Sequence, residues 1–224
     1  EKACGWKKRS GKMPAGKGLG MACSHYVSGA AKPVHWTGEP HAVVNLKLDF
    51  DGGITILTGA ADIGQGSSTI LAQVVGEVLK VDFDRLTVIA NDSRITPKDN
   101  GSYSSRVTFM VGNAALEAAE NLKVILIKAA ARKLEVDPED VECLGESYRV
   151  TGQQGSDIPF KDVVIEALTE SGTITVKGTF TVPKKFQGGK YHGAGVGPSM
   201  AYSYSTLAAQ VDVDDVTGRV TVEK

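Results

Sequence analysis

Residues 42–90 carry the clearest structural pattern in the chain, and their sequence is AVVNLKLDFDGGITILTGAADIGQGSSTILAQVVGEVLKVDFDRLTVIA. Over residues 42–50 apolar and polar side chains alternate, which is the period of a strand with one buried face. The apolar face holds Val44, Leu46, Leu48 and Phe50, and the polar face holds Asn45, Lys47 and Asp49. Asp51-Gly52-Gly53 suits a hairpin turn because glycine accepts positive φ, so residues 54–58 are predicted to form the returning strand.

A helix is predicted over residues 67–79, because apolar side chains recur there at helical spacing. The apolar stripe consists of Ile70, Leu71, Val74, Val75, Val78 and Leu79. Residues 86–90 are rich in β-branched side chains and form the next predicted strand. The order strand, strand, helix, strand predicts an α+β fold in which helices pack on a mixed sheet.

The rest of the chain continues this pattern on both sides. A strand is expected over residues 18–27, and a long helix over residues 107–134, whose alanine-rich face indicates close approach to another element. The later elements are expected to be a hairpin at 141–144 and 147–150, a helix at 160–168, a strand at 173–181 in a small satellite region, a loop at 187–198, and a final hairpin at 208–213 and 219–222. We therefore divide the chain into residues 1–135, a β-β-α-β unit with a long helix, and residues 136–224, a smaller α+β segment ending in a hairpin.

Composition and charge exclude several classes of protein. The 224 residues are 42% hydrophobic and 23% charged, as in a packed soluble protein. With 25 basic and 26 acidic residues the formal net charge is −1, which argues against a nucleic-acid partner. We find no membrane-length apolar run and no signal peptide, and three widely spaced cysteines (Cys4, Cys23, Cys143) indicate reduced thiols in a cytoplasmic compartment. Because the chain begins with Glu1, we expect a piece of a longer polypeptide.

The first candidate site, here called the first junction, is the strand-to-helix connection at residues 61–69. Gly64 and Gly66 bracket Gln65, and two serines open the helix. Glycine lets the backbone approach a ligand closely, and free N–H groups at a helix start favour an anion. The side-chain amide of Gln65 both donates and accepts, which suits the mixed edge of a heterocycle. The alternative is an ordinary tight turn with Ser67 as the N-cap.

The second candidate site, here called the second junction, lies at residues 100–108, where a polar loop meets the long helix. Hydroxyl groups, together with the N–H groups at the helix start that lack intrahelical acceptors, could hold a phosphate, with Arg106 as a charged partner. The alternative is a serine-rich cap beside one solvated arginine. Two polar junctions of similar chemistry in one domain can grip a long anionic ligand without a basic patch, which suits a nearly neutral chain.

In this order, the two junctions resemble those of the molybdenum hydroxylases, the xanthine oxidase-like family. Members of this family carry a molybdopterin cofactor, often as the cytosine dinucleotide, wrapped by several glycine- or serine-rich segments. The turn Gly64-Gln65-Gly66 looks like one such segment, and Ser104-Ser105-Arg106 before an alanine-rich helix looks like another. The hairpin at residues 44–58 is also typical of the family.

The resemblance implies a cofactor-binding role for residues 1–135. The cofactor-binding residues that it implies are Gly64, Gln65, Gly66, Ser104, Ser105, Arg106 and Thr108. Gln65 would bond the pterin, whereas the two serines and Thr108 would meet the phosphate–nucleotide arm near Arg106. In this family the dithiolene sulfurs of the pterin hold the molybdenum, so no metal ligand from the protein is expected. The resemblance also implies iron–sulfur clusters and FAD on partner subunits, and no cysteine pattern in this chain suits a cluster.

Within the family, residues 96–109, 35–41 and 178–180 look most like the 4-hydroxybenzoyl-CoA reductases. That likeness implies reductive dehydroxylation of an aromatic CoA thioester to benzoyl-CoA, with electrons supplied by iron–sulfur carriers. Most relatives run in the opposite direction and add a water-derived hydroxyl to a heterocycle or an aldehyde. A fragment of an aldehyde, carbon monoxide or purine dehydrogenase therefore stays open, as does a non-catalytic role in which the long helix contacts a partner subunit.

Some features depart from the family pattern. The catalytic glutamate of the family lies in a Gly-Val-Gly-Glu-like segment, but Gly195-Val196-Gly197 is followed here by Pro198, so we assign no catalytic residue. The four histidines (His25, His35, His41, His192) lack metal-ligand spacing, which favours structural roles. We expect this chain by itself to fold without catalysing a reaction.

Overall fold

The computed structural model describes residues 2–29, 38–155, 157–186 and 199–223. By their internal contacts the residues form two compact units, one of Glu1–Tyr26 with Tyr202–Lys224 and one of Val27–Ala201. The loop expected at residues 187–198 falls outside the described residues, as do His35, Trp36 and His192. None of the helices in the described part of the chain combines the length and the apolar character that a bilayer span requires.

The larger unit is built on a four-stranded sheet with the order β4-β3-β2-β8. These strands are β2 (Ala42–Leu48), β3 (Ile54–Thr58), β4 (Leu86–Ala90) and β8 (Ile174–Phe180). β2 pairs antiparallel with both β3 and β8, whereas β3 and β4 run parallel and are connected by the helix α2 (Ser67–Leu79). The predicted mixed sheet is therefore confirmed.

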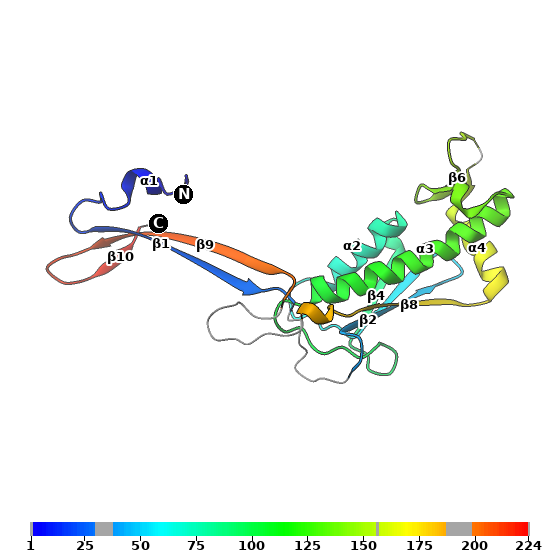
Figure 1. Ribbon diagram of the computed structural model, residues 1–224, viewed down its shortest axis with the longest axis horizontal. Coiled ribbons are helices and arrows are strands. Elements are labelled where there is room, and N and C mark those ends of the chain that lie inside the picture. The colour runs from blue at the N-terminus through cyan, green and yellow to red at the C-terminus, as the bar shows by residue number, and fades with distance from the viewer. Residues whose placement is uncertain (1, 30–37, 156, 187–198, 224) are drawn as a thin grey trace. The chain divides into compact units, whose positions relative to one another are not determined.

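Helices cover one face of this sheet, as Figure 1 shows for α2 (Ser67–Leu79) and α3 (Gly112–Leu134). The strand alternation has the predicted consequence, because Val44, Leu46 and Leu48 are fully buried beneath the helices. Phe50, placed on the same face by its spacing, is instead 81% exposed, because β2 ends at Leu48 and the chain has already entered the turn. The α+β class, with helices packed on a mixed sheet, is confirmed.

The alanine face of α3 lies directly on β8. A Cβ built on Gly178 of β8 would stand 2.0 Å from the Ala114 carbonyl oxygen and 2.3 Å from the Ala118 nitrogen. Only glycine on the strand and alanine on the helix permit such a short separation. The close approach predicted for the long helix is thus made to the chain's own sheet, and the buried alanine face is not available to another subunit.

Residues 136–186 complete the larger unit and are not a satellite. A small sheet forms from β5 (Val141–Cys143), β6 (Ser147–Val150) and β7 (Ile158–Pro159), and α4 (Phe160–Ser171) packs against α3. The strand expected in a satellite region is β8 of the main sheet, so that expectation is wrong. The contacts do not divide the chain at residue 135, and cofactor binding by residues 1–135 stays a prediction.

The smaller unit contains the helix α1 (Trp6–Arg9) and a three-stranded sheet with the order β1-β9-β10. β1 (Lys17–Val27) and the hairpin of β9 (Tyr202–Val213) with β10 (Val220–Val222) confirm the strands predicted at both ends of the chain. β9 begins six residues before the predicted start at residue 208, because its first half pairs with β1 and not with β10.

Candidate functional site

A cavity of about 360 Å³ in the larger unit is shared by the two junctions. Its lining residues are Ile63, Gln65, Ser102, Ser105, Arg106, Val107 and Thr108. The volume lies within the range of small-molecule sites in proteins. The structure therefore brings four of the seven predicted site residues to one cavity, here called the junction cavity, and places Gly64, Gly66 and Ser104 next to them in the chain.

The junctions meet because β3 and β4 are parallel neighbours. The carboxyl ends of parallel strands lie at the same edge of a sheet, and each junction belongs to the loop that follows one of these ends. Gly59, just after β3, permits the crossing, since a Cβ there would stand 2.2 Å from the Pro97 carbonyl oxygen. The Ser102 hydroxyl then donates a hydrogen bond of 2.7 Å to the Ala61 carbonyl and ties the loops together.

The carboxylate of Asp62 occupies the N–H groups of the first junction. It accepts hydrogen bonds from the backbone N–H groups of Gly64 at 3.0 Å, Gly66 at 3.3 Å and Ser68 at 3.2 Å. These bonds, that of Ser68 foremost, lower the pKa of the Asp62 carboxyl below its ordinary value. The expected anion site at this helix start is thus filled by the protein itself, and an Asp two residues before a glycine was the available sequence signal.

The N-cap of α2 is Gly66, in the left-handed conformation, and not Ser67 as the tight-turn alternative supposed. Ser67 is the first helical residue and is buried. Gly64 and Gly66 have φ values of 101° and 75°, and open space lies where their Cβ atoms would stand. A ligand can therefore approach the backbone of this turn closely, as the glycine spacing predicts.

The Gln65 side chain is folded back on its own turn. Its Oε1 accepts a hydrogen bond of 2.6 Å from the Ile63 N–H, and its Nε2 donates to the Ala61 carbonyl at 2.9 Å and to the Ser67 hydroxyl at 3.2 Å. The residue is exposed at the mouth of the junction cavity, so these bonds compete with water. A ligand that replaces them needs only a side-chain rotation.

The second junction has an unusual backbone. Ser104 and Ser105 have φ values of 51° and 49°, in the left-handed region that non-glycine residues rarely adopt. A π-helical turn, η2 (Val107–Val111), follows directly and leads into α3. Such strained residues and π-turns concentrate at functional sites. The Ser105 and Thr108 side chains are exposed in the junction cavity, whereas the Ser104 carbonyl accepts a hydrogen bond of 2.8 Å from Gly29.

Arg106 borders the junction cavity, but its guanidinium is directed into the protein. The side chain is 1% exposed and forms an ion pair of 2.9 Å with Asp99, which is itself 5% exposed. It also donates to the carbonyls of Gly101, at 3.0 Å, and His41. Burial, followed by the nearby arginine charge, lowers the pKa of the His41 imidazole below its ordinary value of 6.5. The alternative of a solvated arginine is excluded, and sequence reasoning missed Asp99 as its partner.

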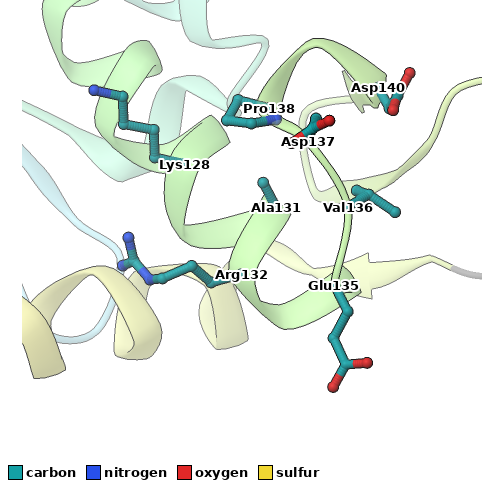
Figure 2. Close-up of a pocket in the computed structure, with 8 residues that line it drawn as sticks. All are labelled: Lys128, Ala131, Arg132, Glu135, Val136, Asp137, Pro138 and Asp140. Carbon is teal, nitrogen blue, oxygen red and sulfur yellow. The ribbon is translucent and has the colours of Figure 1, made fainter.

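A larger cavity of about 640 Å³ lies at the C-terminal end of α3. Figure 2 shows that its charged side chains do not converge, since Lys128, Glu135 and Asp140 point in different directions. Arg132 is paired with Glu166 at 3.1 Å and Glu170 at 2.7 Å. This cavity brings no reactive groups together, and across the described ranges no cluster of His, Cys, Asp or Glu side chains is arranged to hold a metal ion.

Comparison with known proteins yields a family and several relatives. A family model described as the molybdopterin cofactor-binding domain matches residues 1–224. The chain is 27% identical to the 6-hydroxypseudooxynicotine dehydrogenase complex subunit gamma of Paenarthrobacter nicotinovorans, over 95% of this chain and 25% of that protein. It is 31% identical to the probable hypoxanthine oxidase XdhD of Escherichia coli K12, over 80% of this chain and 17% of that protein. The chain thus spans a quarter or less of these relatives.

Solved structures share the fold. The Cu,Mo-CO dehydrogenase matches with a TM-score of 0.77 and 21% identity, over 100% of this chain and 27% of that one. Quinoline 2-oxidoreductase from Pseudomonas putida 86 matches with a TM-score of 0.75 and 23% identity, over 99% of this chain and 28% of that one. At these identities the comparison establishes the fold alone.

Proposed function

Because the chain belongs to the molybdopterin cofactor-binding domain family, we propose that the junction cavity holds part of the molybdenum cofactor in an oxidoreductase. The observation that carries this proposal is that Gln65, from one loop, and Ser105 with Thr108, from another, line the same cavity. When bound, the cofactor supplies a molybdenum centre for two-electron chemistry. The residues of this chain bind and orient it.

Gln65 and its flanking glycines form the end of the cavity that suits a pterin. The open space above Gly64 and Gly66 admits a flat ring against the backbone, and the Gln65 amide can match the donors and acceptors on the ring edge. The Asp62 carboxylate beneath this turn repels phosphate. The anionic arm of the cofactor is therefore directed toward the other end of the cavity.

Ser105 and Thr108 form that other end. Both hydroxyl groups are exposed in the cavity at the start of a helix, where the N–H groups of the first turn have no intrahelical acceptors. Phosphate groups bind favourably at such helix starts. We propose that the pyrophosphate of a molybdopterin cytosine dinucleotide lies here, next to Ser104 and near the Arg106 charge.

Cytidine 5′-diphosphate is a suitable probe for this arm, and isothermal titration measures its binding to the 224-residue chain. Removing the hydroxyl in Thr108→Val weakens binding about 10-fold, because a hydrogen bond to a charged group contributes about 1.5 kcal/mol. Thr87→Val, on the exposed side of β4, is the matched control and binds as the original chain does. Equal affinity of the Thr108 variant and the control would contradict the placement.

For the parent enzyme we propose reduction of 4-hydroxybenzoyl-CoA by two electrons and two protons to benzoyl-CoA and water, on the family likeness of residues 96–109. The second candidate is hydroxylation of a nitrogen heterocycle, in which water supplies the oxygen and two electrons and two protons leave. It is favoured by relatives named nicotine 6-hydroxylase and probable hypoxanthine oxidase. Assays of the enzyme that contains this chain decide between them. One assay pairs the thioester with a low-potential donor, and the other pairs nicotine or hypoxanthine with an electron acceptor.

We further propose that iron–sulfur and flavin subunits assemble with the parent protein, since two relatives are named as a complex subunit gamma and a large subunit. Their cofactors would carry electrons to or from the molybdenum. The cytoplasm is the proposed location, in keeping with three cysteines that form no disulfide in the described part of the chain. The chain by itself is proposed to bind cofactor without catalysing, and activity of the isolated chain toward 4-hydroxybenzoyl-CoA would contradict this.

A further inference from the structure

We propose that Arg106 is a positioning residue, which holds the phosphate end of the junction cavity in shape from inside the protein and makes no contact with the ligand. This inference rests on the proposed function, because it concerns the same cavity. It replaces the direct phosphate contact that the position of Arg106 in the sequence predicts.

The guanidinium of Arg106 already has protein partners in several directions. One terminal nitrogen donates to both carboxylate oxygens of Asp99, at 2.9 and 3.1 Å, and to the Gly101 carbonyl at 3.0 Å. The other donates to the His41 carbonyl, and Nε faces the sulfur of Met110 at 3.4 Å. A planar fork with five donors is suited to such a set of partners, and a lysine ammonium is not.

These partners lie on the segments that shape the cavity. Gly101 precedes the strained pair Ser104-Ser105, and Met110 lies in the π-helical turn that follows. Strained backbone persists only where its surroundings over-determine it. The Arg106 side chain joins the loop before the strained pair to the helix after it, and so holds Ser105 and Thr108 at the cavity.

The same ion pair reaches the other end of the cavity through the loop. The Asp99 carboxylate that pairs with Arg106 also accepts a hydrogen bond of 2.8 Å from the Gly101 N–H. The next residue, Ser102, donates a hydrogen bond from its hydroxyl to the Ala61 carbonyl. The same carbonyl also accepts a hydrogen bond from Nε2 of Gln65. Arg106 therefore positions groups at both ends of the cavity, although its guanidinium faces the interior of the protein.

The test separates positioning from direct contact and from a purely structural charge pair. Arg106→Met is compared with the double variant Arg106→Met/Asp99→Leu, with Arg106→Lys, and with Arg94→Met, a control on the same loop whose side chain is 87% exposed. Each chain is measured for its thermal midpoint, for cytidine 5′-diphosphate affinity, and for amide hydrogen exchange of residues 102–110 without ligand.

Arg106→Met is expected to lower the thermal midpoint, because it leaves Asp99 buried without its cation. The double variant is expected to regain that midpoint, since apolar replacement of a buried pair is often neutral. It should still bind the probe at least 10-fold more weakly and exchange the amides of residues 102–110 at least 10-fold faster than the original chain. Arg106→Lys keeps a cation beside Asp99, so this variant is expected to fold. It should also bind the probe more weakly and exchange the amides of residues 102–110 faster than the original chain, but to a smaller extent than the double variant.

Two results would overturn the proposal. If the double variant binds cytidine 5′-diphosphate and exchanges its amides as the original chain does, the Arg106–Asp99 pair serves stability alone. Lost affinity with unchanged exchange in the ligand-free chain would show that Arg106 binds the phosphate directly. If the original chain itself fails to bind cytidine 5′-diphosphate, the proposed phosphate site fails, whereas the exchange comparison still tests whether Arg106 positions the loop.

Discussion

The hydroxyl of Ser102 donates a hydrogen bond of 2.7 Å to the carbonyl of Ala61, and this contact joins two loops that lie 41 residues apart in the chain. The Ala61 carbonyl also accepts from the Gln65 amide at 2.9 Å. The phosphate end and the pterin end of the proposed cofactor site are therefore linked through one carbonyl group.

Removal of this link in Ser102→Ala should lower the free energy of unfolding by about 1 kcal/mol, the usual net contribution of one hydrogen bond. Binding of cytidine 5′-diphosphate should weaken about threefold, because Ser105 and Thr108 lose part of their support. Urea unfolding and titration calorimetry measure the two effects. Ser205→Ala, which removes an exposed contact with Ser24 in the smaller unit, is the matched control and should leave probe affinity unchanged.

The Asp62 carboxylate should make the unfolding free energy of the chain depend on pH in the acidic range. Its pKa is lower in the folded chain than in the unfolded chain, so the stabilisation is present above the unfolded value and is lost as pH falls through the folded value. Below about pH 4 the unfolding free energy of Asp62→Asn should therefore decrease less than that of the original chain. Urea unfolding across pH 2.5–7 measures this difference. Asp62→Glu, which keeps the charge, should retain that loss. Identical acid profiles for Asp62→Asn and the original chain would contradict this role.

His41 should contribute a second dependence on pH, nearer neutrality. Its Nδ1 accepts a hydrogen bond of 3.2 Å from the Val182 N–H, which requires the neutral ring. Because burial and Arg106 lower the pKa in the folded chain, the unfolded chain binds more protons below about pH 6.5, and stability falls as pH drops through that region. His41→Asn retains an acceptor without titrating, so its unfolding free energy should change less between pH 7 and pH 5.

The contact between Gly178 and α3 should tolerate no side chain. A methyl group at Gly178 would collide with the Ala114 carbonyl oxygen at 2.0 Å, so Gly178→Ala should cost about 3 kcal/mol through helix displacement. For a chain of this length the thermal midpoint should fall by about 6–12 °C. Gly20→Ala, on β1 where a Cβ would meet open space, is the matched control and should shift the midpoint little. A midpoint for Gly178→Ala equal to that of the control would contradict the packing.

Much of the fold could be predicted because it follows from local patterns. The strand Ile54–Thr58, the helix Ser67–Leu79 and the strand Leu86–Ala90 have the predicted bounds. Alternation with period two and apolar spacing near 3.6 residues reflect which face of an element is buried, and both are visible in a single segment. The family resemblance rests on the two junctions and the hairpin at residues 44–58, which are also local patterns, and it identified the correct family.

The position of β8 could not be predicted in this way. Its residues are recognisably a strand, but its neighbour in the sheet is β2, more than 120 residues earlier in the chain. The helix α3 packs on both strands, and Gly178 of β8 permits its close approach. The segment pattern contains no information about that partner.

The sequence by itself determined the elements, the two junctions and the residue types that suit a pterin and a phosphate. Only the tertiary structure decided that the Arg106 guanidinium faces the Asp99 carboxylate and the His41 carbonyl. The physical reason is that a charged side chain in a loop can reach solvent, a ligand or the interior with the same local sequence. The choice depends on which carbonyl and carboxylate groups the distant parts of the chain bring within hydrogen-bond distance.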